Sequence, residues 1–80
     1  MQSQLDYLDK VAFQVARDEF KAYGPLSSGE RAYVALAASR SDLLQDDGYT
    51  IVQAMDRIGP EWLDELNCRW KRISRHQLKA

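Results

Sequence analysis

Residues 32–38 read Ala-Tyr-Val-Ala-Leu-Ala-Ala, a run of seven apolar residues. A helix formed by such a run has no polar face and is usually buried on most of its sides. Four of the seven residues are alanines, which favour helices and disfavour strands, so the run predicts a helix rather than a buried strand. We expect Tyr33, Val34 and Leu36 to be enclosed by the rest of the chain, which packs around this helix.

A capping box marks the start of this central helix. Ser27 is followed three residues later by Glu30, so the hydroxyl can accept from one free backbone N–H while the carboxylate accepts from another. The central helix is therefore expected over about residues 28–40. Between it and the next helix, Leu43 and Leu44 are expected to form a short turn that closes one end of the core.

A second capping box, formed by Thr50 and Gln53, predicts a short helix over about residues 50–58. The apolar face expected for it is made by Ile51, Met55 and Ile58, and Gly59 is expected to end it. Pro60 then suits the first position of another helix, over about residues 60–75. Trp62 and Trp70 share its apolar stripe, and the chain from about residue 74 is polar enough to fray.

The first helix is expected over about residues 3–23, because apolar residues recur there at helical spacing and Gly24 and Pro25 follow. Its apolar arc is wider than one neighbour requires. Phe13 and Phe20, seven residues apart, lie on one edge of that arc. Either this edge packs in the core, or it faces a second copy of the chain and makes a homodimer.

These patterns together predict one all-α domain, residues 1–80, in which about four helices pack around a buried, alanine-rich second helix. Cys68 is the only cysteine, so no intrachain disulfide can form. No apolar run approaches the roughly 20 residues that a membrane span needs. Asp6 and Asp9 precede any long apolar run, which argues against a signal peptide. A soluble cytoplasmic protein is expected.

Neither a catalytic nor a cofactor site is predicted, because no nucleophile, phosphate-loop or metal-ligand motif occurs. The only histidine, His76, lies in the frayed tail. Asp46-Asp47-Gly48 reads as a turn, and a calcium loop built on this glycine would place Leu43, Gln45 and Ala54 at ligand positions, so no metal is expected. Cys68 reads as an exposed, reduced thiol, and a redox role for it stays open.

Charge is distributed unevenly along the chain. Residues 42–65 hold seven acids and one base, whereas residues 69–80 hold five bases and no acid. The acidic stretch suggests a small protein-binding module, an adaptor or inhibitor, that docks on a basic surface of a partner protein. The residues expected to contact a partner are Phe13, Phe20, Asp46, Asp47 and Asp56.

The basic end offers the alternative function of nucleic-acid binding. Four bases recur at three- and four-residue steps and would track phosphates if the helix persists: Arg69, Arg72, Arg75 and Lys79. Against this, the residues after Gly59 include acids at a helix start, which would repel phosphate. Basic residues at the end of a helix also have a simpler use, because they suit its dipole.

Overall fold

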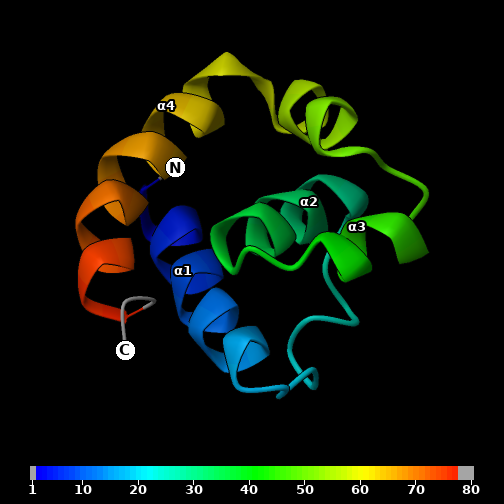
Figure 1. Ribbon diagram of the computed structural model, residues 1–80, viewed down its shortest axis with the longest axis horizontal. Helices are drawn as coiled ribbons and strands as arrows, with labels where there is room; N and C mark the ends of the chain where they lie inside the picture. Colours follow the sequence, from blue (N-terminus) through cyan, green and yellow to red (C-terminus); the bar gives the residue numbers. More distant parts are fainter. Residues whose placement is uncertain (1, 78–80) are drawn as a thin grey trace.

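The computed structural model describes the backbone of residues 2–77 and the side chains of residues 4–70. Its four helices are α1 (Gln2–Ala16), α2 (Ser28–Ala37), α3 (Ser41–Asp46) and α4 (Ile51–Gln77). Figure 1 shows α2 at the centre, with α1 on one side and α4 curving around it; α2 contacts each of the other three helices. No strand occurs in residues 2–77. The all-α class and the central place of the alanine-rich helix are confirmed.

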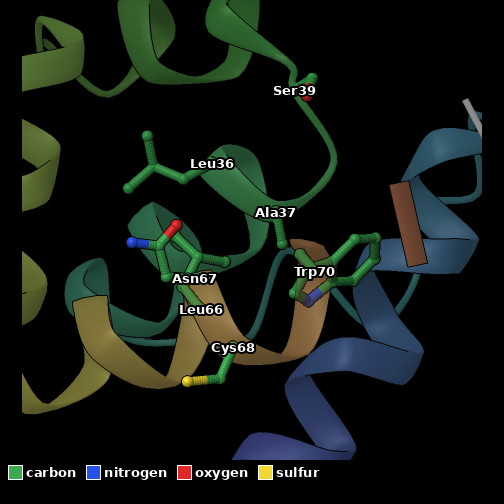
Figure 2. Close-up of a pocket in the computed structure, with 7 residues that line it drawn as sticks. All are labelled: Leu36, Ala37, Ser39, Leu66, Asn67, Cys68 and Trp70. Atoms are coloured by element: carbon green, nitrogen blue, oxygen red, sulfur yellow. The ribbon is translucent and has the colours of Figure 1, made fainter. Parts of the chain in front are cut away.

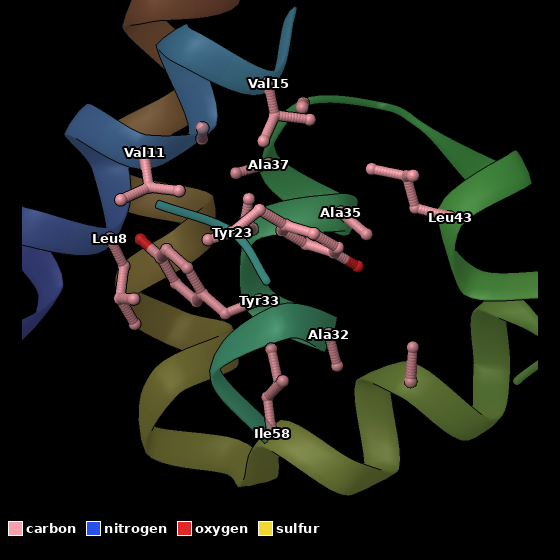
Figure 3. Close-up of a cluster of buried hydrophobic side chains, with 14 of the residues drawn as sticks. Leu8, Val11, Val15, Tyr23, Ala32, Tyr33, Ala35, Ala37, Leu43 and Ile58 are labelled. Carbon is pink, nitrogen blue, oxygen red and sulfur yellow. The ribbon is translucent and has the colours of Figure 1, made fainter. Parts of the chain in front are cut away.

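The core forms around α2, as its sequence predicts. Tyr33 and Val34 are fully enclosed, and Figure 3 shows Tyr33 directed from α2 toward Leu8 and Val11 of α1. Leu36, however, is only partly buried, so the prediction that it is enclosed was wrong. A helix that is apolar all round points side chains in every direction, and the three helices that contact α2 do not fully cover the side on which Leu36 lies.

The first helix ends at Ala16, seven residues before the predicted end. Asp18 adopts the left-handed conformation (φ 62°), the Glu19 N–H donates to the Gln14 carbonyl and the Asp18 N–H to the Val15 carbonyl. This pair of bonds is a Schellman motif, which closes a helix end. The prediction of a helix over residues 3–23 was wrong because Asp18, not Gly24, supplies the left-handed residue.

The same motif ends the next two helices. Ser39 (φ 57°) closes α2, with Arg40 N–H donating to the Ala35 carbonyl, and Gly48 (φ 83°) closes α3. The central helix therefore stops at Ala37, short of residue 40. Both predicted capping boxes are present: Ser27 with Glu30 at the start of α2, and Thr50 with Gln53 at the start of α4.

Leu43 and Leu44 are buried, as predicted, but they lie on the helix α3 rather than on a turn. The two helices predicted over 50–58 and 60–75 are both present within α4: Gly59 (φ 85°, ψ 165°) leaves the helical conformation, kinks the chain and ends the first, as predicted, and Pro60 begins the second. We call residues 51–58 the first arm of α4 and residues 60–77 its second arm. Because of the kink, the two arms reach α2 from different sides (Figure 1).

Asp9 joins three helices through one carboxylate. Its Oδ1 accepts from the Tyr33 hydroxyl (2.7 Å) on α2 and from the Trp70 indole N–H (2.8 Å) on α4, while its Oδ2 accepts from Arg69 Nη1 (2.9 Å). The same guanidinium also binds Asp6 and Glu65. Burial, followed by the hydrogen bond to Asp9, raises the pKa of Tyr33. An acid within the apolar face of α1 is thus satisfied by donors from its neighbours.

Arg40, between α2 and α3, performs a similar task at the C-terminal end of α1. Its Nη1 donates to the Val15 carbonyl and to Asp18 (both 3.0 Å), and its Nε and Nη2 bind both oxygens of Asp42. The guanidinium also lies over the ring of Phe20. These bonds hold the end of α1 and the segment after it against the start of α3, and the hydrogen bonds from Arg40 lower the pKa of Asp42.

Candidate functional site

An exposed apolar strip lies on the first arm of α4. The side chains there are turned differently from the prediction: Ala54 and Ile58 face the core, while Ile51, Val52 and Met55 are 54%, 74% and 37% exposed. The three exposed residues fall within about 100° of helical arc, next to the buried edge. The predicted core face of residues 50–58 was therefore wrong for Ile51 and Met55, because the kink and α2 set which side of this arm is covered.

Two surface hollows lie at the end of α2, and the smaller of them adjoins the strip at Ile51. One, of about 510 Å³, is lined by Leu36, Ala37, Ser39, Leu66, Asn67, Cys68 and Trp70. The other, of about 310 Å³, is lined by Ala35, Leu36, Ser39, Arg40, Ser41, Leu44 and Ile51. They share Leu36 and Ser39 as lining residues, so they lie next to each other at the end of α2, and we call the pair of hollows the groove. Figure 2 shows Leu36 of α2 and Leu66, Asn67 and Trp70 of α4 around the larger hollow.

Apolar side chains line this groove from one arm of α4 to the other. Leu66 comes from the second arm, Leu36 from α2, and Ile51 from the first arm, next to Met55 on the following turn. We call the groove, together with the strip formed by Ile51, Val52 and Met55, the Leu36 surface. Leu36 was expected inside the core, and its partial exposure is what connects the two hollows.

Two exposed acidic side chains, Asp56 and Asp64, lie beside the Leu36 surface. Asp56 lines a separate hollow that includes Val52, with Tyr49 and Arg57, whereas Asp46 lies about 200° around α3 from the groove residue Leu44. Asp64 is exposed on the second arm, one turn before Asn67 and Cys68. No ion pair is formed by these three acids with any side chain among residues 4–70. The Leu36 surface therefore has an apolar floor with two exposed acids, Asp56 and Asp64, at its rim, and with Arg57 next to Asp56.

Phe13 and Phe20 do not share an edge. Phe13 is half-buried against the Trp70 ring, with the ring centroids 5.1 Å apart. Phe20 lies beyond the end of α1, where it is partly exposed beneath Arg40 and meets Tyr23 edge-on. The helical edge from which a homodimer was inferred does not exist, because α1 ends at Ala16.

Of the predicted acidic contact residues, Asp47 is bound within the chain. It pairs with Arg31 (3.1 Å) and accepts from the Tyr23 hydroxyl (3.5 Å). Burial, and next the charge of Asp47, raise the pKa of Tyr23 to about 12. Asp47 therefore holds the segment that follows α1 against α2, whereas Asp46 and Asp56 stay available at the surface.

The predicted basic stripe is only partly described. Arg69 is bound to Asp6, Asp9 and Glu65, so its charge is already compensated. Arg72 and Arg75 lie on the second arm of α4, but their side chains are outside residues 4–70, and Lys79 lies outside the described chain altogether. The one member of the stripe whose contacts are described thus stabilises the fold.

Cys68 is exposed and lines the larger hollow, and among the described residues no group of three His, Cys, Asp or Glu side chains could hold a metal ion. None of the helices in residues 2–77 combines the length and apolarity that a membrane crossing requires. No protein-family model, curated protein or solved structure matches this chain. Any function assigned to it therefore depends on its own surface.

The Leu36 surface could not be read from the sequence, although Leu36, Ile51 and Met55 were singled out there. Helical periodicity groups Ile51 and Met55 with Ile58 but does not say which part of a wide apolar arc the neighbours cover. One feature of the sequence did indicate exposed apolar side chains here. The apolar arc of residues 51–58 includes Val52 and Ala54, so it is wider than the face that packs against one neighbour.

Proposed function

We propose that this chain is a small protein-binding module without catalytic activity, and that a partner protein covers its Leu36 surface. The observation that carries the proposal is the exposed strip on the first arm of α4. Ile51, Val52 and Met55 lie side by side there next to an open apolar groove, in a chain whose other apolar helical faces are largely covered. Contiguous exposed apolar surface with a polar rim is typical of protein interaction sites.

The acidic rim supports the same proposal. Complementary charge around an apolar centre directs and speeds association, while the apolar centre provides most of the affinity. Asp56, inferred from the sequence as a contact residue, lies next to Val52, and Asp64 lies one turn before Asn67 and Cys68 of the larger hollow. An adaptor or an inhibitor of a basic partner would use such a surface. The alternative function of nucleic-acid binding has less support, since Arg69 is bound to three carboxylates.

The proposal can be tested with a photoactivatable amino acid placed at single positions. Introduced in place of Val52, which is largely exposed, it should give a discrete crosslinked product with another protein in cells that express the chain naturally. Tyr7 is the matched control, because it is half-exposed but lies on α1, which lines neither hollow. Absence of a product at position 52, or identical products at positions 52 and 7, would refute the proposal.

A further inference from the structure

We draw no further inference here: the strongest candidate, the exposed apolar strip of Ile51, Val52 and Met55 on the first arm of α4 with the groove beside it, carries nothing beyond the proposed function, because nothing in the structure shows what covers it.

Discussion

Asp9 provides the sharpest test of how this fold is held together. Its side chain is 13% exposed and accepts from Tyr33, Trp70 and Arg69, whereas Asp6, on the preceding turn of α1, binds the same Arg69 atom but is 72% exposed. In Asp9→Asn, an amide oxygen can still accept from Tyr33 and Trp70. The new NH2 group, however, faces the guanidinium, so the charge-assisted bond to Arg69 is lost.

A hydrogen bond to a charged group contributes about 1.5–3 kcal/mol when its partner is left buried. We therefore expect Asp9→Asn to lower the free energy of unfolding by about 2 kcal/mol, which for a chain of this size lowers Tm by on the order of 10 °C. Asp9→Leu removes the acceptor for all three donors and should cost about 3–5 kcal/mol. Asp6→Asn should cost less than about 1 kcal/mol, because exposed ion pairs contribute little.

The measurement is urea unfolding of the three variants and the unsubstituted chain, followed by tryptophan fluorescence and by circular dichroism. A double-mutant cycle between Asp9→Leu, which removes the acceptor, and Tyr33→Phe should give a coupling of about 0.5–3 kcal/mol, since the two residues share one hydrogen bond. Equal losses for Asp6→Asn and Asp9→Asn would refute this account, because burial, rather than the ion pair as such, is what should separate them.

Three further predictions concern the helix ends and the buried tyrosines. Ser39→Gly should stabilise the chain by about 0.5 kcal/mol in thermal unfolding, because Ser39 holds a left-handed conformation that glycine adopts more readily; a loss of stability would contradict the assigned Schellman end. Gly59→Ala should destabilise by about 1–3 kcal/mol through backbone strain alone, since an added Cβ meets no atom within 4 Å, whereas Gly24→Ala, equally open and without positive φ, should be neutral or slightly stabilising. Because the pKa of Tyr23 is raised from 10.0 to about 12, the contribution of this pKa shift to folding stability is complete below pH 10 and is lost as the pH rises toward 12. The urea midpoint should therefore fall less steeply with rising pH in Tyr23→Phe than in the unsubstituted chain. An unchanged slope would mean that Tyr23 is not buried in solution.

Sequence reasoning succeeded where the signal is local. The capping boxes at Ser27 and Thr50 fixed two helix starts, because each is a bond between a side chain and backbone only three residues away. The alanine-rich run likewise predicted its own burial, because a helix of seven consecutive apolar residues has no polar face. Helix ends were predicted less well: Asp18 and Ser39 close α1 and α2 in a conformation that sequence analysis assigns first to glycine.

The interaction surface depended on information that a single helix does not contain. Whether Ile51 and Met55 face the core or the solvent is decided by the direction in which Gly59 turns the chain and by the area that α2 covers. Likewise, the sequence does not show what binds Asp9, because its partners Tyr33, Arg69 and Trp70 lie 24 to 61 residues away in the chain. The rim acids were noted from the sequence, but not the apolar floor beside them.

The contact of Trp70 with Asp9 and Phe13 also gives the molecule a built-in optical signal. This indole is shielded from water, bonded to a carboxylate and stacked near a phenyl ring, and all three features vanish once the second arm of α4 detaches from α1. Trp62, by contrast, lies edge-on to Tyr33 of the central helix, closer to the kink. Retaining one indole at a time, with phenylalanine at the other position, would let stopped-flow emission time the docking of each half of that arm separately.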